Sequence, residues 1–151
     1  MADYHALARF HYCAGRPATV CRIVAVRYLA PGAARWTPAA VAVLSYPTPV
    51  SRGRERALHL RGWSYGGRLR LVNAQIRTIS RVIVHPAFRS LGLSTLLVRR
   101  LIDLCPTRYV EALARMGRAH PLFERAGMTR FDPERDDEPV YYLFDRAARS
   151  H

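Results

Sequence analysis

The chain has 151 residues, the size of one ordinary domain, and half of them are apolar, which excludes a wholly disordered protein. A membrane-spanning helix needs about 18 consecutive apolar residues, and no apolar run in the sequence approaches that length. The first residues do not show the basic stretch followed by an apolar one that is typical of a secretory signal. We therefore expect a cytoplasmic protein that does not bind a membrane. The formal net charge is +13, carried by 24 arginines without a lysine, and this excess favours anionic partners.

The positive charge is unevenly distributed along the sequence. Residues 1–102 contain 16 arginines and two acidic residues, whereas residues 103–151 contain eight arginines and nine acidic residues. A field of this sign attracts polyanions, so nucleic acid is a predicted partner. The alternative is a solubilising surface without a specific ligand.

The cysteines do not form a recognisable pattern. Cys13, Cys21 and Cys105 are odd in number and lack a CxxC spacing. We therefore expect neither a disulfide framework nor a metal site.

The first third of the chain predicts a short helix followed by a pair of strands. Residues 3–12 form the expected helix, with Asp3 as its N-cap. Residues 18–29 and Ala39–Tyr46 are apolar and rich in β-branched side chains, which is typical of strands. Because a turn at Pro31-Gly32 separates these two strands, we expect them to pair antiparallel.

The stretch Pro47–Asn73 is the least regular part of the sequence and is predicted to be a basic loop. Trp63 and Tyr65 lie among its arginines, beside two glycines. A basic loop interleaved with aromatics binds a phosphate backbone and stacks on bases, whereas the alternative is an arginine-rich insertion that covers a sheet edge. The arginines predicted to contact nucleic acid are Arg52, Arg54, Arg56, Arg61, Arg68 and Arg70.

The second half of the chain alternates strands and helices. Apolar residues at helical spacing predict an amphipathic helix that Pro106 ends. In chain order the expected elements are strand Thr78–Val84, helix Leu93–Cys105, strand Arg108–Leu113, short helix Pro121–Ala126 and strand Val140–Phe144. This order predicts one α+β domain over residues 1–151, with a mixed, mostly antiparallel sheet flanked by helices.

The loop between the strand Thr78–Val84 and the long helix is predicted to bind an anion. Amides at the start of a helix lack acceptors within the helix, and the helix dipole adds positive potential there. Gly92 lets the backbone approach a phosphate, and Arg89 supplies a fixed charge. Ser94 and Thr95 add hydroxyl donors. The alternative is a plain connection between strand and helix.

Two segments resemble motifs of the GNAT acyltransferase superfamily. Arg89-Ser-Leu-Gly92-Leu-Ser94 resembles motif A, Arg/Gln-x-x-Gly-x-Gly/Ala after a strand, and Arg118–Met128 resembles motif B. The resemblance implies a GNAT-like fold and transfer of an acyl group from acetyl-CoA or another acyl-CoA. It also implies that the backbone of Val82, Ile83 and Val84 pairs with the pantetheine arm. The amides implied to hold the pyrophosphate are those of Arg89, Ser90, Leu91, Gly92, Leu93 and Ser94.

Three residues depart from the motifs of the superfamily. Ser90 stands where many members have Gly, and Ser94 stands where Gly or Ala is usual. Phe123 replaces the motif B tyrosine that protonates the departing thiolate. Because phenylalanine has no exchangeable proton, that role is filled elsewhere or is not needed, and Tyr141 and Tyr142 are candidates for it.

The candidate catalytic residues lie outside the two motifs. Glu111, an acid among apolar neighbours on the strand after the long helix, is a candidate base; alternatively, it pairs with Arg81 or Arg115. The resemblance places the first helix beside the acceptor site, so His11 and Tyr12 are further candidates. Their alternative role is packing.

A second, narrower resemblance concerns the acceptor substrate. Phe10–Pro17 together with Ile79-Ser-Arg81 resembles the phage Mom-type proteins, GNAT-like enzymes that modify adenine in DNA. It implies modification of a nucleic-acid base, with DNA favoured over RNA and an adenine amino group as the acceptor. The alternatives are an N-acetyltransferase for a small amine or a protein N-terminus, and a non-catalytic module that binds acyl-CoA or DNA.

Overall fold

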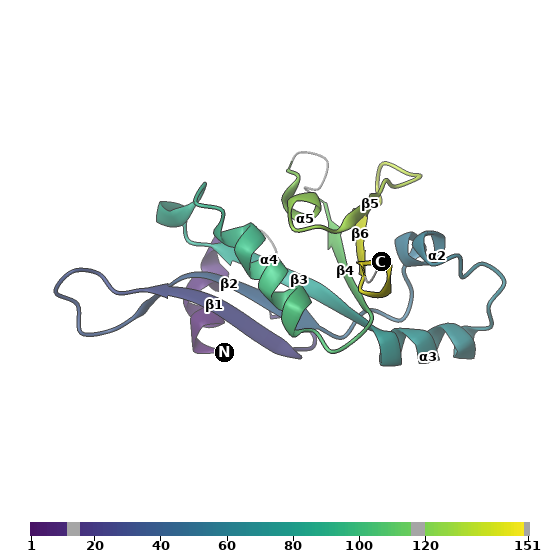
Figure 1. Cartoon of the computed structure of the whole chain (residues 1–151), viewed down its shortest axis with the longest axis horizontal. Coiled ribbons are helices and arrows are strands. Elements are labelled where there is room, and N and C mark those ends of the chain that lie inside the picture. The colour runs from purple at the N-terminus through teal and green to yellow at the C-terminus, as the bar shows by residue number, and fades with distance from the viewer. Residues whose placement is uncertain (12–15, 116–119, 150–151) are drawn as a thin grey trace. The chain divides into compact units, whose positions relative to one another are not determined.

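The computed structural model describes residues 1–11, 16–115 and 120–149. The chain divides into two compact units, which we call the first and the second unit (Figure 1). The first unit consists of Met1–Ser45 with Ile79–Leu104, and the second consists of Tyr46–Thr78 with Cys105–His151. Strand β3 (Ile76–Val84) contributes residues to both units. The expectation of a single domain stays a prediction.

The first unit is built on the strands β1 (Arg22–Tyr28) and β2 (Thr37–Ser45). They pair antiparallel, with Ile23 opposite Val43 and a register shift after Val26. The strand order in this unit is β1-β2-β3. The predicted antiparallel pair is therefore confirmed, with different bounds.

Helix α1 (Ala2–Leu7) is shorter than the predicted helix and is followed by a 3₁₀ turn over residues 8–10. The prediction of Asp3 as N-cap is wrong, because Met1 holds that position and Asp3 lies in the first turn. The carboxylate of Asp3 accepts hydrogen bonds from Arg27 of β1, the shortest at 2.6 Å. Asp3 thus ties the helix to the strand instead of capping it.

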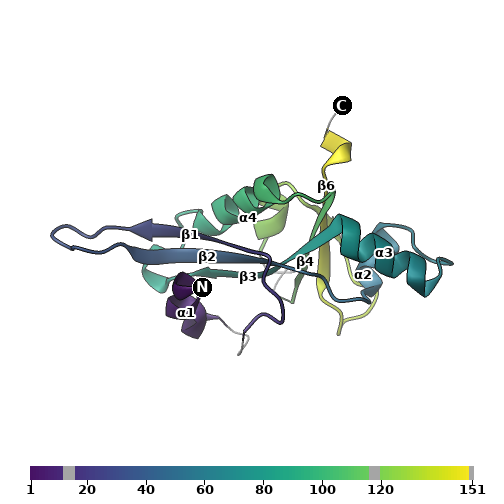
Figure 2. The ribbon, with the colours of Figure 1, turned by 90° about the horizontal axis from the view of Figure 1, so that it is seen from below.

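The core of the first unit lies on both faces of its strands, as Figure 2 shows, with α1 on one face and α4 (Leu93–Leu104) on the other. The buried face of α4 packs on β1 and β2 and confirms the predicted amphipathic helix within one residue of its expected end. The α4 residues on that face are Leu97, Val98, Leu101 and Ile102. On the α1 face, the core cluster comprises Tyr4, Leu7, Val41, Val43 and Ile83.

The second unit contains the strands β4 (Tyr109–Ala114), β5 (Thr129–Phe131) and β6 (Val140–Asp145). Its strand order is β3-β4-β6-β5, and β6 pairs antiparallel with both of its neighbours. Helix α5 (Leu122–Arg125) has Ala126 as its C-cap and is followed by Gly127, whose φ is +93°. Strand β5 was not predicted, because three residues are too few for a periodic signal. The predicted α+β class, with a mostly antiparallel sheet and flanking helices, is confirmed.

The stretch predicted as a basic loop contains two helices, α2 (Arg52–Ala57) and α3 (Tyr65–Gln75). Each begins at a serine N-cap: Ser51 accepts from the Arg54 amide at 3.4 Å, and Ser64 accepts from the Gly67 amide at 3.1 Å. The prediction of an irregular loop is therefore wrong, because capping and tertiary packing outweigh the weak apolar periodicity of this stretch.

Gly53 allows α2 to pack closely on β6. A Cβ atom at Gly53 would lie 2.5 Å from the Cβ atom of Tyr141, closer than two such atoms come in proteins. The glycine is therefore required by the space between helix and strand.

None of the helices in the described part of the chain is long and apolar enough to cross a membrane.

Candidate functional site

The loop between β3 and α4 is anchored to the first unit at its beginning. The His85 amide donates to the Ala39 carbonyl at 2.8 Å, and the His85 ring meets the Phe10 ring edge to face at 4.8 Å between centroids. Nδ1 of His85 accepts from the Ala87 amide at 3.2 Å, which starts a 3₁₀ turn over residues 86–88. The ring of Phe88, at the end of that turn, lies 4.5 Å from the Tyr28 ring. These contacts therefore fix the position of residues 85–88, which precede the predicted anion-binding residues 89–94.

The next residues carry two left-handed backbone positions. Arg89 is extended, and then Ser90 and Gly92 adopt φ values of +67° and +75°. Glycine takes this conformation without strain, whereas for serine it is uncommon and costs roughly 1 kcal/mol. Left-handed residues alternating with ordinary ones aim successive amides towards one side, a backbone arrangement that binds anions. The loop thus keeps a strained conformation that presents its amides.

Helix α4 continues this arrangement. Its first helical hydrogen bond runs from the Leu96 amide to the Gly92 carbonyl at 3.1 Å. The amides of Leu93, Ser94 and Thr95 therefore have no acceptor within the helix, and the helix dipole places roughly half a positive charge there.

The surroundings of Gly92 fit a diphosphate. A Cβ atom at Gly92 would meet no heavy atom within 4 Å, so its side of the loop is open to a ligand. Arg89 is exposed, and within the described residues its guanidinium makes no ion pair. A doubly charged group with many acceptor oxygens matches this set of amides and one guanidinium. The predicted loop residues are thus contiguous at the start of α4, and their binding of an anion stays a prediction; we call residues 89–94 the anion cradle.

The three predicted strand residues end β3 just before this loop. The Ile83 side chain is buried in the core of the first unit, while those of Val82 and Val84 are half-buried. This alternation is that of a regular strand. The predicted pairing of their backbone with a pantetheine arm stays a prediction.

Glu111 of β4 is fully buried in the second unit and accepts four hydrogen bonds. Arg54 donates to both carboxylate oxygens, at 2.8 Å and 2.7 Å. The Thr78 hydroxyl donates to Oε1 at 2.6 Å, and the Tyr141 hydroxyl donates to Oε2 at 2.7 Å. The predicted alternative, an ion pair of Glu111 with Arg81 or Arg115, is therefore wrong, because the partner of Glu111 is Arg54.

The four groups form a closed polar cluster. Burial lowers the pKa of Arg54, but its hydrogen bonds and charge interaction with Glu111 outweigh burial and raise it. Burial, then the charge of Glu111, raises the pKa of Tyr141. Both groups therefore keep their protons at neutral pH. The guanidinium of Arg54 also donates to the Thr48 carbonyl at 2.9 Å, so the prediction that Arg54 contacts nucleic acid is wrong.

Tyr142 points to the opposite face of β6 from Tyr141, as alternation along a strand requires. Its ring packs on that of Phe123, with 5.0 Å between centroids. Burial, then the charge of Glu124, raises the pKa of Tyr142. The phenylalanine at the motif B position is therefore a packing residue against a buried tyrosine.

The remaining arginines of the 47–73 stretch divide into paired and unpaired groups. Arg52 and Arg56 both donate to Glu138, at 3.1 Å and 3.2 Å. Arg68 donates to Glu55 at 2.6 Å. The exposed residues Arg61 and Arg70 make no ion pair within the part of the chain that the structure describes, and the nearby side chains of Trp63 and Tyr65 are 50% and 58% exposed.

The candidates from the N-terminal segment are placed only in part. His11 is half-buried and follows the 3₁₀ turn with an extended backbone, so the prediction that it lies in a helix is wrong. Tyr12 lies outside the described residues. Sequence reasoning missed the contact between Arg54 and Glu111, because 57 positions separate the two residues and no local pattern links them.

The comparison with family models finds one match. Residues 59–128 match the model of the "Acetyltransferase (GNAT) family", and this range contains both motif-like segments from the loop and from α5. No curated protein sequence matches the chain.

Several solved structures resemble this chain. The KacTA–DNA complex is 14% identical, with a TM-score of 0.55, and the match covers 88% of this chain and 72% of that one. Aminoglycoside acetyltransferase AAC(6')-Ib, in complex with coenzyme A and kanamycin, is 22% identical over 74% of this chain, with a TM-score of 0.47. An N-acetyltransferase from Staphylococcus aureus Mu50 is 14% identical over 71% of this chain and 63% of its own, with a TM-score of 0.43. The chain spans 62% of the AAC(6')-Ib chain.

Proposed function

We propose that the chain, whose residues 59–128 match the model of the acetyltransferase (GNAT) family, is an acyltransferase of that family, which transfers an acyl group from acetyl-CoA or another acyl-CoA to an amine and releases coenzyme A. One observation carries the proposal: the loop from Arg89 to Ser94 forms an open cradle of amides that leads into α4. A plain connection between strand and helix has no need for a serine in the left-handed region.

The bound acyl-CoA supplies an activated acyl thioester. In our proposal the amides of residues 89–94 and the Arg89 guanidinium hold its pyrophosphate. The backbone of Val82, Ile83 and Val84 holds the pantetheine arm. An amide near Ile83 or Val84 then donates to the thioester carbonyl and stabilises the charge that develops on its oxygen.

Glu111 has a positioning role in this proposal instead of the predicted role of a base. A carboxylate offers about four acceptor positions, and Arg54, Thr78 and Tyr141 fill that number. No acceptor position is then left for a proton from the substrate amine. Glu111→Gln is expected to change kcat without shifting the pH profile of the reaction. A profile whose acidic limb disappears in Glu111→Gln would restore the role of base, because an essential base loses activity when it is protonated at low pH.

We infer that the amine belongs to a nucleic-acid base, with an adenine amino group in DNA as the first candidate. The net charge of +13 supports this inference, as do the exposed aromatics Trp63 and Tyr65 beside Arg61 and Arg70. Stacking on bases and contact with phosphates need this combination. The predicted contact through Arg68 is less available, because Glu55 engages its guanidinium, whereas Arg52 and Arg56 each donate to Glu138 and keep further N–H groups.

The cofactor assignment is tested by calorimetric titration of the chain with coenzyme A. Gly92→Asp is expected to weaken binding by about tenfold or more, because it places a carboxylate beside the pyrophosphate. Gly32→Asp is the matched control: Gly32 lies in the β1–β2 turn, its φ is +77°, and a Cβ atom there would likewise meet no heavy atom within 4 Å. Equal affinity in both variants would remove the cradle from the proposal.

The acceptor assignment is tested by mass spectrometry. The chain is incubated with acetyl-CoA in four parallel reactions, each of which contains one acceptor: DNA, RNA, a peptide or a small polyamine. An acetyl mass gain on DNA adenine supports the first candidate, and a gain on a peptide or polyamine supports the alternative acceptors. If the chain binds coenzyme A but no acceptor gains an acetyl mass, the result supports a non-catalytic module that binds acyl-CoA.

A further inference from the structure

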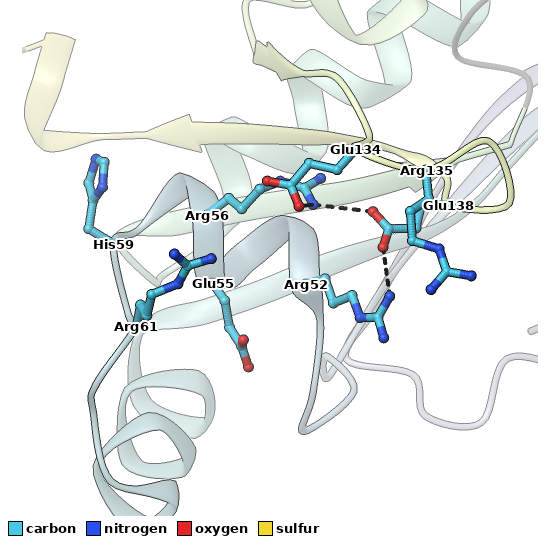
Figure 3. A pocket seen from close by; sticks show the side chains of 8 residues that line it. All are labelled: Arg52, Glu55, Arg56, His59, Arg61, Glu134, Arg135 and Glu138. Atoms are coloured by element: carbon cyan, nitrogen blue, oxygen red, sulfur yellow. Dashed lines mark hydrogen bonds and ion pairs between the residues drawn. The ribbon is translucent and has the colours of Figure 1, made fainter.

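The second unit contains a pocket of about 580 Å³ that is lined by Arg61 and by arginines of α2. Figure 3 shows side chains of α2 on one side and of the segment before β6 on the other, with His59 and Arg61 completing the lining. The charged side chains that decide its chemistry are Arg52, Arg56, Arg61, Arg135, Glu134 and Glu138. Its volume is within the range of small-molecule sites, about 300–1,000 Å³.

Helix geometry explains why α2 presents two arginines to the pocket. Residues four positions apart lie on the same face of a helix, so Arg52 and Arg56 point to one side, and Arg54, between them, points to the other. Arg54 is fixed by its buried pair with Glu111, and Gly53 packs against Tyr141. The wall that carries Arg52 and Arg56 is therefore rigid.

Glu138 fixes the positions of both guanidiniums. Its side chain is 14% exposed, and each carboxylate oxygen accepts from one arginine. Hydrogen bonds from Arg52, then from Arg56, lower the pKa of Glu138, so it stays charged at neutral pH. One carboxylate thus orders two guanidiniums and neutralises half of their charge.

The pocket has more donors than its own acidic residues can occupy. Each guanidinium has five N–H groups, and Arg61 forms no ion pair within the described residues. Glu134 is 68% exposed and lies 3.7 Å from Arg56, a loose contact that a stronger acceptor can replace. An ammonium group finds no unpaired carboxylate here, because Glu55 is also paired, with Arg68. The unfilled capacity is for an oxyanion.

We propose that this pocket binds a phosphate ester, with Arg56 and Arg61 as its principal donors and Arg52 as a further one. The identity of the ligand rests on the proposed function, because we assign the phosphate to the substrate that receives the acyl group. Guanidiniums bind phosphate oxygens in pairs of hydrogen bonds, which suits two arginines on neighbouring walls. A free nucleotide and a nucleic-acid backbone both carry this group.

The test measures binding of inorganic phosphate, adenosine monophosphate and a single-stranded oligodeoxynucleotide to the full chain by calorimetry. Arg61→Gln and Arg56→Gln are each expected to weaken all three by about fivefold to tenfold. Arg108→Gln removes a paired, exposed arginine of the same unit that lies outside the pocket, and it is expected to have no effect. Tighter binding of the oligonucleotide than of the mononucleotide identifies the nucleic-acid backbone as the source.

A variant of opposite sign keeps the test independent of folding defects. Glu134→Gln removes the loosely held carboxylate and is expected to tighten phosphate binding about twofold to fivefold. If Glu134→Gln does not tighten binding and Arg61→Gln does not weaken it, the pocket is not a phosphate site. Coenzyme A affinity is measured in the same variants. If the unmodified chain does not bind coenzyme A, the proposed function alone is overturned. If coenzyme A binds and the variants leave phosphate affinity unchanged, the phosphate site alone is overturned.

Discussion

The two units use arginine in different ways. The first unit has nine arginines and two acidic residues, and the second has fifteen arginines and nine acidic residues. In the first unit the anion cradle is made mainly of backbone amides, with Arg89 beside it. In the second unit guanidiniums are held by carboxylates, from the buried Arg54 to Arg52 and Arg56 at the pocket.

The number of arginines in a region therefore does not define a ligand surface. The 47–73 stretch contains six arginines and one acidic residue, yet four of these arginines bind acidic side chains. The loop at Gly92 contains one arginine, and in our proposal its backbone amides make it the better anion site. Variants that separate structural arginine pairs from ligand contacts therefore test this comparison directly.

The largest effect is expected from the buried pair of the second unit. Glu111→Ala leaves the Arg54 guanidinium buried without a counter-charge, which costs about 3–5 kcal/mol of unfolding free energy. Urea denaturation followed by circular dichroism measures this loss. The double variant Arg54→Met with Glu111→Leu is expected to recover most of it. A loss below about 1 kcal/mol in Glu111→Ala would mean that the pair behaves like a surface pair.

A smaller loss is expected from the packing of α2 on β6. Gly53→Ala places a Cβ atom against the Tyr141 side chain, and overpacking of this kind costs about 1–3 kcal/mol. Gly66→Ala in α3 is the matched control, because the nearest heavy atom to its added Cβ is 3.8 Å away at the end of the Arg70 side chain. The control is expected to be neutral or stabilising. Equal thermal midpoints for the two variants would contradict the close packing.

The pH dependence of Glu138 has a defined sign. Its folded pKa is lowered below its ordinary value of 4.5 by hydrogen bonds from Arg52 and Arg56. The stability that it contributes is therefore present above pH 4.5 and is lost as the pH falls through the lowered pKa. Unfolding of the unmodified chain and of Glu138→Gln is compared from about pH 7 to about pH 2.5. The difference should be largest at neutral pH and vanish at the acid end.

The smallest effect is expected from the Asp3–Arg27 pair of the first unit. This pair is well aligned, with its shortest bond at 2.6 Å, but Arg27 is exposed to solvent. Solvent and salt screen such pairs, so we expect a double-mutant cycle of Asp3→Asn and Arg27→Gln to give a small coupling that disappears in about 1 M salt. A coupling as large as that of Arg54 with Glu111 would remove the contrast between the units.

Local sequence patterns predict the elements that contain a strong periodic or motif signal. Helix α4 has an apolar face over three turns and a proline after its end, and its predicted bounds differ from the observed ones by one residue. Strand β6 begins with five apolar residues and β3 is rich in β-branched residues, and both strands are also predicted. Helices α2 and α3 escape prediction, because glycines and arginines obscure their periodicity and a serine cap alone is a weak signal.

The α+β class, the excess of positive charge and the place of the loop that we propose to bind an anion follow from the sequence alone, because each depends on residues that are close together in the chain. Which arginines are available to a ligand depends on the tertiary structure. Arg54 and Glu111 meet through the packing of α2 on β6 and β4, and Arg56 and Glu138 meet because the segment before β6 lies beside α2. Charge pairing depends on distance in space, and residues 57 or 82 positions apart give no local sign of it.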